Sequence, residues 1–213
     1  MTPRHSLAVD PLLLHVLGLL DRLGDAVAPN PLDERARIIA LLDQGEAIVG
    51  SGREWELTKY ALVSWIDEML VETEWSSREW WSNNVLEMEL FRTRLCSEQF
   101  FTFAKEASTL ARRDALEAYY VCVVLGFRGL YRDPMLAAML TQRHGLPQDL
   151  STWAKQTALA IRLGQGRPEL AEAERELHGA PPLRPRAAVV WPWLFAGMFA
   201  AWNVIYFTLF FSR

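Results

Sequence analysis

The stretch EWELTKYALVSWIDEMLVETE, residues 54–74, decides the fold class. Its apolar side chains recur at intervals of three and four residues, which is the spacing of one face of an α-helix. The residues on that face are Leu62, Trp65, Ile66, Met69 and Thr73. The flanking sequence shows neither sustained apolar–polar alternation nor an Asn-Gly turn, so a β-sheet has no support. We therefore predict an all-α protein with a long helix over Glu54–Glu74.

Start and stop signals predict further helices on both sides of this stretch. Asn30-Pro31 supplies an N-cap and a first-turn proline, and Gly50-Ser51-Gly52 ends the helix that follows. Asp-Pro pairs at residues 10–11 and 133–134 repeat that start signal, and a capping box precedes the helix that ends near Arg92. The predicted helices cover residues 11–27, 32–49, 54–74, 76–92, 98–110 (capped by Ser97), 113–125, 134–144 and 152–163. Short connections favour antiparallel neighbours in bundles.

Composition excludes several classes of protein. The 213 residues are 51% apolar and 23% charged, which is enough chain for one sizeable core and too apolar for a disordered tail. The 22 Lys and Arg residues against 26 Asp and Glu give a net charge of −4, and no basic stripe is present, so nucleic-acid binding is not expected. Cys96 and Cys122 are too few for a disulfide framework. One bridge is possible, but a reducing compartment is the better expectation.

Residues 187–211, AAVVWPWLFAGMFAAWNVIYFTLFF, form 25 consecutive positions without a charge. As a helix this segment is about 37 Å long, which exceeds the ~30 Å hydrocarbon core of a bilayer. Trp191 and Trp193 stand where an aromatic belt would lie. A buried core helix is the alternative, but it needs a larger protein around it. We predict a transmembrane anchor.

Arg184 and Arg186 precede this segment, whereas only Arg213 follows it, so the positive-inside rule places the body in the cytoplasm. A signal peptide at Leu12–Leu20 is a weaker alternative, because acidic residues precede and follow that stretch. The Gly- and Pro-containing stretch before the anchor predicts a semi-rigid linker. The expected organisation is a helical domain over 1–163, a linker over 164–186, the anchor over 187–211 and an outer-side tail over 212–213.

No motif for catalysis, cofactor binding or metal binding is found. The sequence lacks a phosphate-binding loop, a dinucleotide-binding turn and a GxSxG elbow, and neither cysteine belongs to a CxxC pair. The histidines His5, His15, His144 and His178 are scattered. Asp67 and Glu68 are adjacent on a helix and point about 100° apart, which is poor geometry for an acid–base pair. We expect no cofactor or metal, and an enzyme of unrecognised type is the minor alternative.

Two segments stand out from an ordinary helical bundle. Asp67 and Glu68 interrupt an otherwise apolar helix, and the segment LGFRGLYRDP, residues 125–134, has two glycines that permit positive φ. Three interpretations of the two acids remain open: exposed charges on an outer face, a clamp in which one acid pairs with Arg128 or Arg132, and a contact with a partner protein. The partner-contact candidates are Asp67, Glu68, Glu72, Trp75, Arg128 and Arg132.

KYALVSWIDE, residues 59–68, and LGFRGLYR, residues 125–132, resemble the signature stretches of the DotU family, also called the TssL or IcmH family. Its members are inner-membrane components of type VI and type IVb secretion machines. SEQFF, residues 97–101, is similar to the family's GGExFF region, although Leu95, Cys96 and Ser97 replace the glycines. The resemblance covers about residues 11–163 and the terminal span.

This resemblance implies a cytoplasmic helical domain of two small packed bundles plus one C-terminal transmembrane helix. It further implies a non-catalytic structural subunit of a type VI secretion membrane complex. The implied partners are an IcmF/TssM-like inner-membrane protein and cytoplasmic baseplate proteins. A type IVb DotU-like subunit and a tail-anchored regulatory adaptor of another pathway are the alternatives.

The predicted span also carries a pattern that favours self-association. Small residues at i and i+4 occur twice in succession, and they permit close approach of two helix backbones in lipid. Asn203 continues the same face with a polar group that a partner amide would satisfy. The residues concerned are Ala196, Gly197, Ala200, Ala201 and Asn203. We predict a dimer through this face, while the alternatives are that small residues are simply common in spans or that the face meets an IcmF-like partner.

Overall fold

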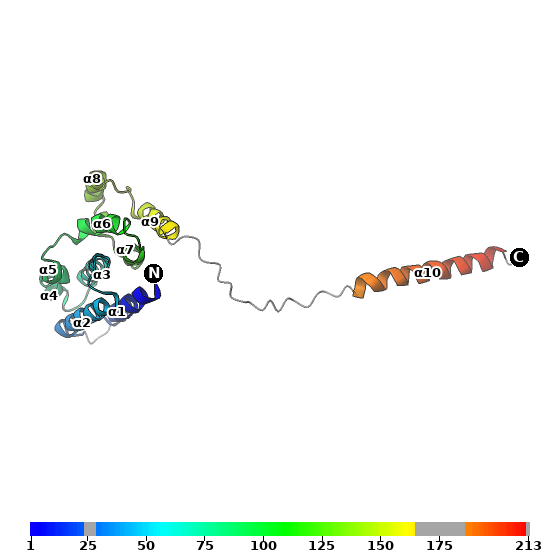
Figure 1. Cartoon of the computed structure of the whole chain (residues 1–213), viewed down its shortest axis with the longest axis horizontal. Helices are drawn as coiled ribbons and strands as arrows, with labels where there is room; N and C mark the ends of the chain where they lie inside the picture. Colours follow the sequence, from blue (N-terminus) through cyan, green and yellow to red (C-terminus); the bar gives the residue numbers. More distant parts are fainter. Residues whose placement is uncertain (24–28, 165–185, 212–213) are drawn as a thin grey trace. The chain divides into compact units, whose positions relative to one another are not determined.

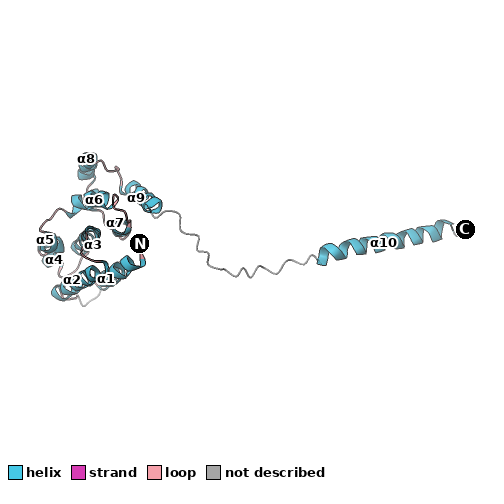
Figure 2. Ribbon diagram, viewed as in Figure 1, coloured by secondary structure: helices cyan, strands magenta, loops and turns pink. Residues whose placement is uncertain are grey.

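The computed structural model of the protein describes residues 1–23, 29–164 and 186–211. The chain divides into two compact units, Met1–Arg167 and Pro168–Arg213. Throughout the described ranges the regular structure is helical, without a strand, which confirms the all-α prediction (Figure 2). The helices are α1 (Pro3–Arg22), α2 (Pro31–Val49), α3 (Arg53–Glu72), α4 (Arg78–Asn83), α5 (Leu86–Phe91), α6 (Cys96–Ala107), α7 (Asp114–Val124), the 3₁₀ helix η1 (Gly129–Arg132), α8 (Pro134–His144), α9 (Leu150–Gly164) and α10 (Arg186–Phe211).

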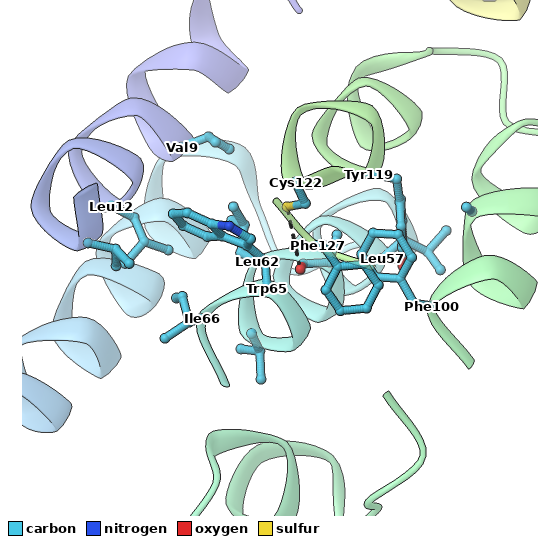
Figure 3. Packing of buried hydrophobic residues seen from close by; sticks show 14 of the residues in the cluster. Val9, Leu12, Leu57, Leu62, Trp65, Ile66, Phe100, Tyr119, Cys122 and Phe127 are labelled. Carbon is cyan, nitrogen blue, oxygen red and sulfur yellow. Dashed lines mark hydrogen bonds between the residues drawn. The ribbon is translucent and has the colours of Figure 1, made fainter. Parts of the chain in front are cut away.

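Helix α3 lies at the centre of the first unit. It packs against α1 and α2 on one side and against α6 and α7 on the other (Figure 1). Every residue from Tyr60 to Asp67 is buried, so α3 is enclosed on all sides rather than on the single face that its apolar spacing predicts. Because side chains from both sides of α3 belong to one contiguous apolar cluster, the surrounding helices share a single core (Figure 3).

Aromatic side chains fill the part of this core between α6 and the segment after α7. Phe100 and Phe127 stack with ring centroids 3.9 Å apart, and Tyr119 meets Phe100 edge-on at 4.7 Å (Figure 3). Trp153 of α9 meets Phe101 edge-on at 5.2 Å. Offset and edge-on aromatic pairs of this kind add about 0.5–1.5 kcal/mol each beyond the burial of their area. The Gly-containing segment after α7 is thereby fixed to the core through Phe127.

Three of the predicted helices differ from the observed ones in their bounds, caps or continuity. The helix predicted over 98–110 spans Cys96–Ala107, so Ser97 lies inside it and does not cap it. The helix predicted over 11–27 begins at Pro3 and has Pro11 inside it. Pro11 lacks the N–H that would bond to the carbonyl of Leu7, a residue on the exposed side of the helix. It ends at Arg22, and residues 24–28 lie outside the described ranges. The helix predicted over 76–92 is split into α4 and α5, and Ser77 makes no side-chain cap. Asp67, as shown below, takes the N–H groups that would otherwise continue that helix.

Helix α10 covers 26 residues, and its side chains are described for residues 193–208. Within the described residues, no helix meets the length and apolarity needed to cross a membrane. The predicted linker lies outside the described residues except at its two ends, and so does the predicted tail, residues 212–213.

Candidate functional site

Asp67 lies in the buried middle of α3, and its carboxylate accepts three hydrogen bonds. Oδ1 accepts from Trp81 Nε1 at 3.0 Å and from the Leu86 N–H at 2.9 Å, and Oδ2 accepts from the Glu87 N–H at 2.8 Å. Leu86 and Glu87 open α5, so Asp67 binds N–H groups that a helix leaves unpaired in its first turn. Burial raises the pKa of Asp67 to about 6 against the opposing effect of these bonds.

The Glu87 carboxylate likewise accepts a hydrogen bond from an N–H group at the start of the next helix, α6. This residue is 2% exposed. Oε1 accepts from the hydroxyls of Tyr60 and Thr93, both at 2.7 Å, and from the Leu95 N–H at 3.0 Å. Oε2 accepts from the N–H of Cys96, the first residue of α6, at 3.2 Å. Glu87 carries no recognisable sequence signal, because it stands eight and nine residues before its backbone partners, whereas a capping box spans three.

Glu68 points toward the segment between α7 and η1. Its two carboxylate oxygens accept from the N–H groups of Arg128 at 2.7 Å and Gly129 at 2.9 Å. Arg132 Nη2 forms an ion pair with the same side chain at 2.9 Å. The segment needs its glycines, because Gly126 has φ +112° and a Cβ at Gly129 would lie 2.9 Å from the Phe127 ring. Glu68 therefore holds a tight glycine loop against α3.

These contacts separate the interpretations of the two acids. The outer-face interpretation is wrong, because Asp67 is 3% exposed and the Glu68 side chain 8%. The clamp is confirmed for Glu68, which pairs with Arg132 and binds the loop backbone. Asp67 instead binds α5 and the Trp81 indole. Adjacent positions on a helix point about 100° apart, so the two carboxylates reach different segments.

A cleft of about 310 Å³ lies beside these carboxylates, and Glu72, Arg94 and Arg132 contribute to its lining. Glu72 is exposed and forms an ion pair with Arg132. Trp75 is half-buried, where its indole donates to the Leu70 carbonyl at 2.8 Å. The Arg128 side chain is exposed and makes no hydrogen bond or ion pair with any side chain that the structure describes. Among the described residues, accessible charges around the loop and the cleft therefore include those of Glu72, Arg94, Arg128 and Arg132.

The thiols and histidines carry less chemistry than the carboxylates. Cys96 and Cys122 are free, and burial raises the pKa of both thiols, so they stay protonated at neutral pH. The histidines, scattered in the sequence, are not all isolated in space. Within the described ranges, His5 lies close to Glu54 and Asp114. Because these three residues come from helices far apart in sequence, no spacing signal could have shown this.

Comparisons with known proteins place the chain in a family. The model of the type VI secretion system protein DotU matches residues 7–212. The cytoplasmic domain of TssL from Acinetobacter baumannii has a similar fold, with a TM-score of 0.60 and 22% identity over 77% of this chain and 99% of that one. The comparison with curated proteins gives no match. Because the DotU model extends over nearly the whole sequence, the chain belongs to the DotU family of type VI secretion system proteins.

Proposed function

We propose that this protein is a non-catalytic structural subunit that links the inner-membrane complex of a type VI secretion system to cytoplasmic baseplate components. The match of the DotU model over residues 7–212 carries the proposal, and its description favours a type VI over a type IVb system. The carboxylates of Asp67, Glu68 and Glu87 support a structural role. Each one accepts hydrogen bonds from backbone N–H groups that hold a helix start or a loop.

The proposal includes anchoring of α10 in the inner membrane as a single pass, with the N-terminal helical domain in the cytoplasm. The 25 uncharged residues of 187–211 support the anchor, since about 20 apolar residues suffice for a helical span. Arg184 and Arg186 support the orientation, because basic residues flank spans on the cytoplasmic side.

We further propose that the charged rim, defined as Glu72, Trp75, Arg128 and Arg132, contacts a partner. That partner is an IcmF/TssM-like inner-membrane protein or a baseplate protein. Arg128 is the residue best suited to this role, because its guanidinium is exposed and uncommitted within the described part of the chain. Glu68 would act indirectly, by fixing the loop that presents Arg128, whereas Asp67 would act by holding the start of α5.

Arg128→Glu tests the rim in a strain that lacks the native gene. We expect export by the type VI system to fall at least about tenfold, with the melting temperature unchanged, because an exposed and unpaired side chain contributes little to stability. Arg37→Glu, an equivalent reversal at an exposed position of α2, is the matched control and should leave export intact. Normal export with Arg128→Glu, or an equal loss with the control, would contradict the proposed contact.

We also propose that the span mediates self-association through the stripe formed by Ala196, Gly197, Ala200, Ala201 and Asn203. Asn203 Nδ2 donates to the Phe199 carbonyl at 2.9 Å, which leaves its amide oxygen able to accept from a neighbouring helix.

In a membrane two-hybrid assay, Gly197→Leu or Asn203→Val should lower the signal about threefold or more, since such contacts contribute ~0.6–2 kcal/mol. Met198→Leu, on the opposite side of the helix, serves as the control. An unchanged signal in both stripe variants would rule out this dimer.

A further inference from the structure

Three side chains from three helices meet at one end of the core. His5 lies in α1, Glu54 in the first turn of α3, and Asp114 at the start of α7. One nitrogen or oxygen atom from each lies within 4.8 Å of those of the other two. His5 is 2% and Asp114 4% exposed, whereas Glu54 is partly exposed. The cluster is therefore enclosed on two sides and reachable from solvent through Glu54.

The hydrogen bonds around the cluster leave lone pairs available. The Thr58 hydroxyl donates its single hydrogen to the Glu54 carbonyl at 2.9 Å, so His5 Nε2 must be the donor in its 2.9 Å contact with Thr58 Oγ1. A neutral His5 ring thus carries a free lone pair on Nδ1. Burial lowers the pKa of His5. Glu54 Oε1 is buried and accepts no hydrogen bond from the described residues.

The Asp114 carboxylate accepts two hydrogen bonds and has lone pairs left for further ligands. Its oxygens accept from the backbone N–H of Thr2 at 2.6 Å and from the Thr2 hydroxyl at 2.8 Å, and each carboxylate oxygen has a second lone pair. Burial, and then the charge of Asp114, raise the pKa of Glu54, while Arg112 acts in the opposite direction. The nearby N-terminal ammonium is paired with Glu117. A neutral imidazole with two carboxylates carries two negative charges, which a divalent cation would balance.

We propose that His5, Glu54 and Asp114 bind a divalent transition-metal ion, for which Zn²⁺ is the best match. An imidazole with two carboxylates is a ligand set that favours such ions over Mg²⁺ or Ca²⁺, which prefer oxygen ligands alone. Metal–ligand bonds of about 2.0–2.1 Å in a tetrahedral site place the ligand atoms about 3.3 Å from one another. The distances between the three ligand atoms, which are at most 4.8 Å here, must therefore shorten by about 1.5 Å or less. Glu54 has the freedom to do so. The ion would tie α1 to α3 and α7, with water in the fourth position.

The test is a Zn²⁺ titration of the metal-free full chain in detergent micelles. Wild type should bind one equivalent, with Co²⁺ giving the absorption bands of a tetrahedral site. Its melting temperature should rise by roughly 5–10 °C at a Zn²⁺ concentration about 100-fold above Kd. Glu54→Gln keeps the shape of the side chain and should weaken binding at least about tenfold, because it removes a charged ligand. His144→Gln, which changes a histidine 3.7 Å from Glu98, should bind as wild type does.

Two outcomes would overturn the proposal. One is the absence of a saturable Zn²⁺ site in wild type. The other is equal Zn²⁺ affinity in wild type and Glu54→Gln, which would place any bound ion elsewhere. Because Glu54 is partly exposed, its variant should fold, and near-UV circular dichroism of the metal-free protein verifies this before titration.

Discussion

Asp67→Ala should lower the free energy of unfolding of the helical domain by about 3–5 kcal/mol, because it removes the acceptor of three hydrogen bonds from buried N–H donors. The substitution leaves the Trp81 indole N–H and the N–H groups of Leu86 and Glu87 without their acceptor. Each unsatisfied buried donor costs about 1–3 kcal/mol, although local relaxation and water recover part of the sum. The expected fall in melting temperature is about 10 °C, measured by near-UV circular dichroism on the full chain in micelles.

Two variants make this measurement specific. Glu74→Ala removes an exposed acid just after α3 and should change the free energy of unfolding by less than about 0.5 kcal/mol. Asp67→Asn keeps one acceptor oxygen and should be less destabilising than Asp67→Ala. An Asp67→Ala protein as stable as wild type would show that Asp67 does not hold the start of α5.

Glu87→Ala should be similarly destabilising, by about 3–5 kcal/mol, because it too removes the acceptor of several hydrogen bonds from buried donors. It would leave the Thr93 hydroxyl and the N–H groups of Leu95 and Cys96 without their acceptor. The Tyr60 hydroxyl would keep only its 3.1 Å contact with Gln99 Oε1. Hydrogen exchange should be fastest at the beginning of α6, whereas Asp67→Ala should affect α5 first. The location of the fastest hydrogen exchange therefore distinguishes the role of Glu87 from that of Asp67.

Glu89→Ala is the matched control for Glu87. It lies two residues away on α5, and its ion pair with Arg35 leaves the Glu89 side chain 50% exposed. Exposed pairs contribute about 0–1 kcal/mol, so this variant should remain near wild-type stability. If Glu87→Ala and Glu89→Ala had equal effects, burial of the Glu87 carboxylate would not determine the stability of this region.

The local features of the fold were predictable from sequence because local chemistry determines them. The helix over Pro134–His144 follows an Asp-Pro start signal, and its observed bounds agree with the prediction. Gly126 and Gly129 adopt the positive φ that their place in the loop suggested. The pairing of Glu68 with Arg132 was one of the stated alternatives, since both belong to segments that interrupt the apolar pattern.

The remaining features depend on contacts between distant segments. The break between α4 and α5 follows from an acid on α3, and nothing within residues 76–92 specifies it. Glu87 resembles any other acid of an exposed helix until α3 and α6 are placed around it. Likewise, α3 is enclosed on all sides because α1, α2, α6 and α7 cover it, although its own spacing indicates one apolar face.

The central claim is that the chain serves type VI secretion as a membrane-held structural subunit. A strain lacking the native gene, supplied with either the full chain or a chain ending at Arg186, tests this claim most directly. We predict that the full chain remains in the membrane after an alkaline wash and restores export. The shortened chain should be soluble and folded, with the near-UV spectrum of the helical domain, and should not restore export. Alkaline-resistant membrane association of the shortened chain, or normal export in its presence, would contradict the account.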